Sequence, residues 1–303
     1  MEESEFLKKK IKKSLPLYAF MLPAMIYLLL FHYIPMYGVQ IAFKDFSNRA
    51  GILGSPWVGL KHFIKFIQYP NFTLLIKNTF ILGIYSIATF PCAIIFALLL
   101  NEVRNAKFKK TVQMISYMPH FLSTVVVCSM LQLFLRPDTG ILNVIIGALG
   151  GSGQDFLTVP EYFADIYVWS GVWQQIGWNS IIYISALAGV SGELVEAARV
   201  DGAGRLRVIW HIYIPSILPT IVIMLILSCG NILSVGFEKV FLLQNSLNLS
   251  TSQVISTYVY EIGLKGGQFS YSSAIGLFNN IVNVALLSAV NYMAKKLSGT
   301  GIW

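Results

Sequence analysis

The chain has 303 residues, of which 55% are hydrophobic and only 12% are charged. With a mean hydropathy of +0.65, it carries more apolar surface than a water-soluble fold of this size can bury, so we expect lipid to solvate much of it. The formal net charge of +8 would suit either nucleic acid or an anionic membrane surface. The basic residues cluster at the ends of apolar segments, which favours the membrane and indicates no nucleic-acid partner.

Six apolar segments are each long enough to cross the hydrocarbon core, which takes about 20 residues of helix. In chain order, these predicted spans cover 15–37, 74–100, 112–135, 166–188, 212–233 and 271–293. The first follows a basic arm, 1–14, and its apolar run is too long for a signal peptide and has no small-residue cleavage site after it. We therefore expect it to be retained, so that 15–303 forms one transmembrane domain.

The orientation follows from the basic residues in alternate loops, because cationic segments stay on the cytoplasmic side. Of the 22 Lys and Arg residues, 14 fall on the side of the N-terminus and 8 on the other side. We therefore expect both termini to be cytoplasmic, in a multi-pass protein of the cell membrane.

The most informative loop is predicted to connect the fourth and fifth spans on the cytoplasmic side, over 189–211. From Glu196 it reads EAARVDGAGRLRVIWHIYIP, ending at Pro215. Good helix formers precede Glu196, and Gly202 and Gly204 interrupt the pattern about two turns later, so a short helix ending in a turn is predicted. An ordinary charged connector between two spans is the alternative.

This segment resembles the EAA loop of ABC importer permeases, in which Glu-Ala-Ala is followed by a spaced Gly and then by Ile-x-Leu-Pro. Glu196, Gly202 and Pro215 fall on the pattern, and Ile214 replaces the usual Leu. The resemblance implies an all-α integral membrane protein of about six transmembrane helices, with the type I, maltose-permease-like fold. It also implies that the segment from Glu196 to Gly204 is a coupling helix that docks on a separate ATPase. The residues assigned to coupling are Glu196, Ala197, Ala198, Asp201, Gly202 and Gly204.

Further stretches resemble permeases for oligosaccharides derived from complex polysaccharides: Leu17 to Pro23, His32 to Phe46, Trp57 to Phe63 and Asn78 to Phe80. The family resemblance implies four kinds of partner: a second homologous permease, two cytoplasmic ATPase subunits, an extracellular solute-binding protein and a sugar. The sequence contains no GxxxxGK[ST] phosphate loop, so this chain is not expected to hydrolyse ATP. We expect it to bind no cofactor, with ATP and Mg on the partner ATPase.

Sugar recognition combines aromatic faces with amides that bond hydroxyl groups. Two predicted spans, 166–188 and 271–293, carry that mixture. The candidates for the substrate path are Trp173, Gln174, Trp178, Asn179, Tyr183, Asn279, Asn280 and Asn283. Interfacial Trp residues and Asn residues that join helices would explain the same pattern.

Two rival functions fit the sequence less well. A membrane-embedded enzyme would need convergent catalytic or metal-binding groups, but the four histidines are dispersed and the three cysteines lie in separate apolar stretches. An ion-coupled secondary carrier would place ionisable residues near the bilayer midplane and show repeated halves. The predicted spans are nearly free of charge and show no repeat, which favours the permease.

Overall fold

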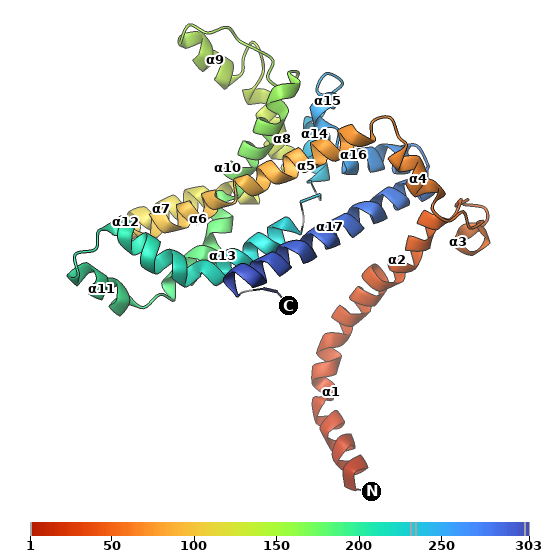
Figure 1. Cartoon of the computed structure of the whole chain (residues 1–303), viewed down its shortest axis with the longest axis horizontal. Helices are drawn as coiled ribbons and strands as arrows, with labels where there is room; N and C mark the ends of the chain where they lie inside the picture. Colours follow the sequence, from red (N-terminus) through yellow and green to blue (C-terminus); the bar gives the residue numbers. More distant parts are fainter. Residues whose placement is uncertain (1, 231, 234, 300, 303) are drawn as a thin grey trace. The chain divides into compact units, whose positions relative to one another are not determined.

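The computed structural model in Figure 1 describes residues 2–230, 232–233, 235–299 and 301–302, without the side chains of 2–10, 12, 13 and 297. The described part is nearly all helical, and its β structure is an isolated bridge between Lys44 and Trp57. The chain divides into two compact units, which are described separately. The first comprises Met1–Phe66 with Ile262–Leu277, and the second comprises Ile67–Glu261 with Phe278–Trp303.

In the first unit, a long helical segment is followed by a small folded region, 43–66, which we call the head. The helices are α1 (Glu2–Leu28), α2 (Ile34–Met36), α3 (Gly51–Gly54) and α4 (Lys61–Ile67), with a π-helical turn at Leu29–Tyr33 and a 3-10 turn at Tyr37–Phe43. In the head, Phe43 stacks on Trp57 with ring centroids 5.5 Å apart. The Asp45 carboxylate accepts a hydrogen bond from Lys61 Nζ at 2.6 Å, and this bond lowers the Asp45 pKa below its usual value.

The second unit contains most of the helices. They are α5 (Phe72–Ala88), α6 (Pro91–Asn101), α7 (Ala106–Tyr117), α8 (Thr124–Phe134), α9 (Ile141–Ala148), α10 (Phe163–Ala188), α11 (Gly192–Val200), α12 (Arg205–Val208), α13 (Ile214–Cys229), α14 (Phe237–Leu243), α15 (Leu249–Ser252) and α16 (Ile255–Tyr260). Helix α17 (Phe269–Ser298) begins in the first unit and continues in the second. Helix α10 runs beside α6 and also packs on α7 and α13 (Figure 1).

The described residues contain four helical stretches that are long and apolar enough to cross a bilayer: Ser14–Phe43, Phe72–Asn101, Arg205–Cys229 and Phe269–Lys296. Two bent pairs raise the number to six if each pair is one span. They join Ala106–Phe121 to Thr124–Phe134 at 100°, and Pro160–Ala188 to Gly192–Val200 at 75°. The predicted fold class, all-α with about six transmembrane helices, is confirmed.

The structure differs from the unbroken helix expected over 112–135, because this segment bends sharply between α7 and α8. Pro119 has no amide hydrogen to continue the helical ladder, and Leu122 adopts an extended conformation. The Ser123 hydroxyl then caps the new helix α8 by accepting a hydrogen bond from the Val126 amide at 3.3 Å. The local sequence therefore ends one helix and starts another.

Close packing of α10 on α7 depends on Gly177. A Cβ at this position would collide with the backbone carbonyl of Ser116, which lies in α7. Small residues at such contacts let transmembrane helices approach closely. This contact holds α10 against α7, the helix that precedes the bend.

Two apolar clusters form the core of the second unit. The first joins α6, α10, α11, α12 and α13 through Ala93, Ile94, Ala97, Leu98, Tyr183, Leu187, Val195, Val208, Tyr213 and Ile217. The second contains Leu82, Cys128, Phe163, Val235, Val240, Leu243 and Val254. Because Val195 belongs to α11 and Tyr183 to α10, the loop at 189–211 shares one core with the long helices.

Candidate functional site

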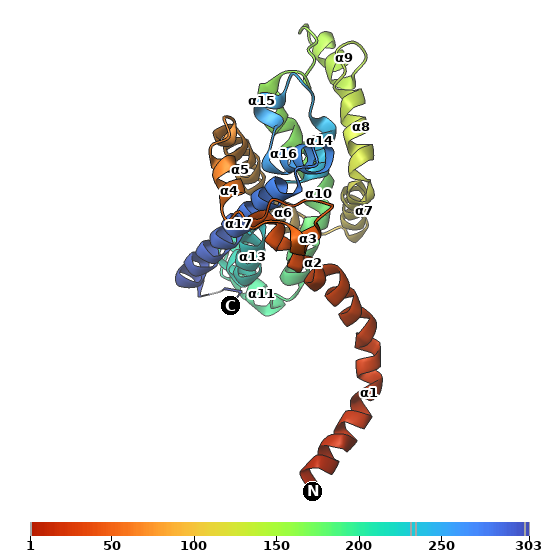
Figure 2. The ribbon, with the colours of Figure 1, turned by 90° about the vertical axis from the view of Figure 1, so that its right-hand side faces the viewer.

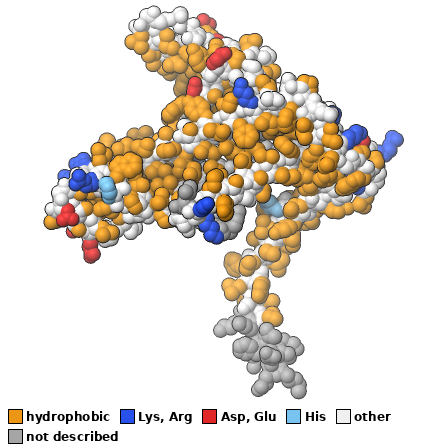
Figure 3. Space-filling view, in the orientation of Figure 1, with side chains coloured by type: hydrophobic (Ala, Val, Ile, Leu, Met, Phe, Trp, Pro, Cys, Tyr) orange, Lys and Arg blue, Asp and Glu red, His pale blue; other side chains and the backbone are white. Residues whose placement is uncertain are grey.

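The loop at 189–211 lies at one end of the second unit. In Figure 2, α11 lies at the opposite end of this unit from α9. Acidic and basic side chains gather over α11 and α12, whereas hydrophobic side chains cover the neighbouring helices (Figure 3). An end of this polarity belongs in water, and the apolar flanks beside it suit lipid or other apolar protein surfaces.

Helix α11 is anchored on one side and free on the other. Val195 is only 8% exposed and sits in the first core cluster, and Ala198 packs against that cluster. Glu196 and Ala197 are exposed. The small, charged face of α11 is therefore available to another protein, while its apolar face holds it to the bundle.

The turn after α11 requires a glycine. Gly202 has a φ of +78°, in the left-handed region that side chains disfavour. Its amide donates to the Arg199 carbonyl at 3.1 Å, and the Ala203 amide donates to the Ala198 carbonyl at 2.9 Å, which closes the helix end. The helix spans Gly192–Val200, earlier than the predicted 196–204, because Gly202 and Gly204 lie in the turn beyond it.

Exposed apolar side chains surround this turn, and the sequence pattern did not single them out. Leu194, Val200 and Leu206 are exposed, Val200 to 88%. They lie next to the exposed carboxylates of Glu196 and Asp201. With the exposed Arg199, Arg205 and Arg207, these side chains form a mixed apolar and charged surface. Exposed apolar side chains gathered in this way can mark a protein-binding face.

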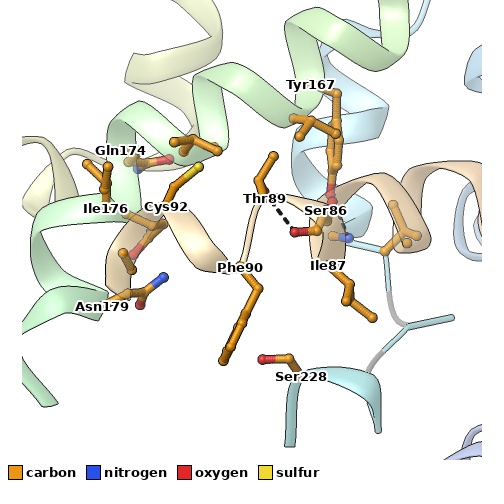
Figure 4. A pocket seen from close by; sticks show the side chains of 18 of the residues that line it. Ser86, Ile87, Thr89, Phe90, Cys92, Tyr167, Gln174, Ile176, Asn179 and Ser228 are labelled. Atoms are coloured by element: carbon orange, nitrogen blue, oxygen red, sulfur yellow. Dashed lines mark hydrogen bonds between the residues drawn. The ribbon is translucent and has the colours of Figure 1, made fainter. Parts of the chain in front are cut away.

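The second candidate site is a cavity of about 620 Å³ within the second unit. Its walls come from α5, α6, α10, α13, α14 and the segments beside them (Figure 4). The polar side chains that line it are Ser86, Thr89, Thr124 of α8, Tyr167, Gln174, Gln175, Asn179, Tyr183, Ser228, Glu238 and Lys239. Apolar walls with a few polar groups are typical of a small-molecule site.

Three of the residues predicted for a substrate path line this cavity: Gln174, Asn179 and Tyr183. Asn179 reaches into it from α10 (Figure 4) and makes no hydrogen bond to another described residue. Gln174 donates from Nε2 to the Leu122 carbonyl at 3.0 Å, so it supplies a partner for the backbone at the bend between α7 and α8. Tyr183 is 2% exposed; it lines the cavity and also belongs to the first core cluster.

The two tryptophans predicted for the path lie elsewhere. Trp178 stacks on His120, with ring centroids 4.1 Å apart, and His120 Nδ1 lies 2.8 Å from Gln175 Oε1. Trp173 is 46% exposed and does not line the cavity. The stack of Trp178 on His120 fastens α10 to the turn after α7.

None of the three predicted asparagines of α17 lines the cavity. Asn283 Oδ1 accepts a hydrogen bond from the Leu233 amide at 3.2 Å, and Asn279 Nδ2 donates to the Leu233 carbonyl at 3.5 Å. Asn280 is exposed. Asn279 and Asn283 thus bind backbone groups of the segment between α13 and α14. Gln174 plays the same part at the bend between α7 and α8, where it binds the Leu122 carbonyl.

Lys239, which the sequence did not single out, also lines the cavity. It lies on α14, outside the candidate spans. Its Nζ donates to the Tyr167 carbonyl at 2.7 Å and lies 5.0 Å from the centroid of the Tyr167 ring. Burial lowers the pKa of Lys239 to about 8. In the part of the chain that the structure describes, no group of His, Cys, Asp and Glu is arranged to hold a metal ion.

Membrane-length helices around a cavity with a few polar groups, and an exposed helix and turn at one end, are typical of a membrane transport protein. Residues 89–299 match the family described as binding-protein-dependent transport system inner membrane components, and the chain belongs to this family. That membership assigns the chain a transport role in a membrane.

Similar proteins come from Bacillus subtilis (strain 168). The polygalacturonan/rhamnogalacturonan transport system permease protein YteP is 47% identical over 100% of this chain and 94% of its own length. Protein LplB is 42% identical over 97% of this chain and 92% of its own.

Two solved structures are similar to this chain over nearly its full length. A bacterial ABC transporter involved in importing the acidic polysaccharide alginate has a chain with a TM-score of 0.89 and 40% identity, over 96% of this chain and 99% of that one. A bacterial alginate ABC transporter in complex with an alginate pentasaccharide-bound periplasmic protein has a TM-score of 0.90 and 39% identity, over 97% and 99%. The fold is therefore that of an ABC importer permease.

Proposed function

We propose that this chain is the permease subunit of an ATP-driven importer that moves a sugar, an oligosaccharide, into the bacterial cytoplasm. Family membership supports the transport role, and the names of the relatives support a polysaccharide-derived substrate. The chain supplies the path and a separate ATPase supplies the energy, because the sequence has no phosphate loop of its own.

The observation that carries this proposal is the core shared by the exposed loop and the cavity wall. Val195 on α11 and Val208 on α12 pack in the same cluster as Tyr183, which lines the cavity. Close-packed cores transmit displacement because they resist compression. A partner that moves α11 therefore moves α10, and with it one wall of the cavity.

The proposed complex contains a second homologous permease, two ATPase subunits that hold ATP and Mg, and a solute-binding protein outside. The alginate transporter bound to its periplasmic protein supports the last of these. The exposed apolar and charged surface around Glu196 suits an ATPase cleft. Copurification tests the whole set: mild detergent extraction of the tagged chain should yield an ATPase and a second permease by mass spectrometry. Elution of the chain alone, with full transport activity, would refute the proposal.

We further propose that both termini and the 189–211 loop are cytoplasmic, from the distribution of basic residues. Single cysteines at Ser152 and Arg205, introduced into a variant without native cysteines, should differ in labelling. A membrane-impermeant maleimide applied to intact protoplasts should label the cysteine at 152 and spare the one at 205. Lysed cells, in which both should react, provide the control, and labelling at 205 in intact protoplasts would reverse the orientation.

A further inference from the structure

Lys239 lines the cavity without a carboxylate partner among the described residues. The ion pairs described in the chain involve Asp45 with Lys61 and His62, not Lys239. Glu238 also lines the cavity, but adjacent helical residues point about 100° apart. The partners of Lys239 Nζ are instead the carbonyl oxygen and the ring of Tyr167, both of which leave its positive charge uncompensated.

The ammonium group of Lys239 lies against Gly171 of α10, where a Cβ would stand only 3.4 Å from Nζ. Since glycine carries no side chain, Nζ can approach the backbone of α10 closely. Gly171 and Lys239 both line the cavity of about 620 Å³, so the ammonium group borders space that a ligand can occupy. Burial disfavours the charged form of Lys239, and a bound anion would stabilise that form again.

We infer that Lys239 binds the carboxylate of an acidic sugar unit, a uronate, as the oligosaccharide passes through the cavity. This inference rests on the proposed function and names its substrate class. A carboxylate beside Nζ would form a charge-assisted hydrogen bond in a partly desolvated site. Alginate, the cargo of the similar transporters, is described as an acidic polysaccharide, and polygalacturonan, which names the YteP system, is a polymer of uronic acid.

The test compares two substrates that differ in charge and little in size. The complete importer, reconstituted in liposomes with its solute-binding protein, is given a labelled oligogalacturonide or its methyl ester of equal length. Because the same binding protein serves every variant, its own preference cancels when the ratio of kcat/KM for the two substrates is compared. The variants are Lys239→Met, Lys239→Arg and the control Lys77→Met, which removes an exposed charge on α5 away from the cavity.

Lys239→Met should lower kcat/KM for the charged oligosaccharide at least about tenfold and leave the methyl ester nearly unaffected. Lys239→Arg should keep most of the preference, and Lys77→Met should keep all of it. An equal loss on both substrates, or no loss, would overturn the role of Lys239 while leaving the proposed function intact. Uptake of neither substrate by the wild-type importer would overturn this inference, whereas failure to accumulate any oligosaccharide with ATP would overturn the proposed function as well.

Discussion

Gly202→Val should uncouple ATP hydrolysis from sugar uptake in an importer that still assembles. The Gly202 backbone has a φ of +78°, and no atom lies within 4 Å of where a Cβ would stand, so the effect comes from backbone strain and not from a clash. A left-handed conformation costs a residue with a side chain roughly 1–2 kcal/mol, and more for a β-branched one. The loop should relax by redirecting α11, which displaces the surface around Glu196 from its partner.

The measurement is uptake per ATP hydrolysed by the purified, reconstituted complex. Gly192→Ala is the matched control, since Gly192 also has open space around it but does not have a positive φ. Glu196→Lys provides a second variant without backbone strain, and a like-charge clash in the docked state should also lower uptake at least about tenfold. Parental coupling in both variants would remove α11 from the proposed mechanism.

Asn179→Trp should block the cavity and lower sugar uptake at least about tenfold, which corresponds to about 1.4 kcal/mol. Asn179 reaches into the cavity and makes no hydrogen bond to another described residue, so the substitution adds bulk without breaking a structural contact.

Asn280→Trp is the control, because Asn280 is an exposed asparagine of α17 that does not line the cavity. Uptake by proteoliposomes that hold equal amounts of assembled complex is the readout. Equal uptake by both variants would show that the substrate takes another route.

The spans were predictable because a long apolar run is a local property of the sequence. The breaks within them were not. The bend at Leu122 is held by Gln174 and the segment at Leu233 by Asn283, in each case an amide about 50 residues away along the chain. The sequence pattern of aromatic and amide residues predicted sugar contacts. In the structure, these two amides bind backbone groups that the breaks leave without a helical partner.

The two candidate sites also differ in how far the local sequence predicts them. The loop at 189–211 has a local pattern, so the position of the helix end and its glycine turn could be predicted within a few residues. Lys239 has no such pattern, because its place in the cavity depends on Tyr167 and Gly171 of α10, far from it in the sequence. Asn179 was predicted from composition, and the fold distinguishes it from its neighbours by the direction in which it points.

The most direct test of the central claim is ATP-dependent uptake. Proteoliposomes should contain this chain, its partner permease and the ATPase, with the solute-binding protein and a labelled oligosaccharide at the face opposite α11. We predict that sugar accumulates only when ATP and Mg are present on the α11 side, and that an inactive ATPase abolishes accumulation whatever ion gradient is imposed. Accumulation driven by a proton or sodium gradient, without ATP or the ATPase, would contradict the account and identify the chain as an ion-coupled carrier.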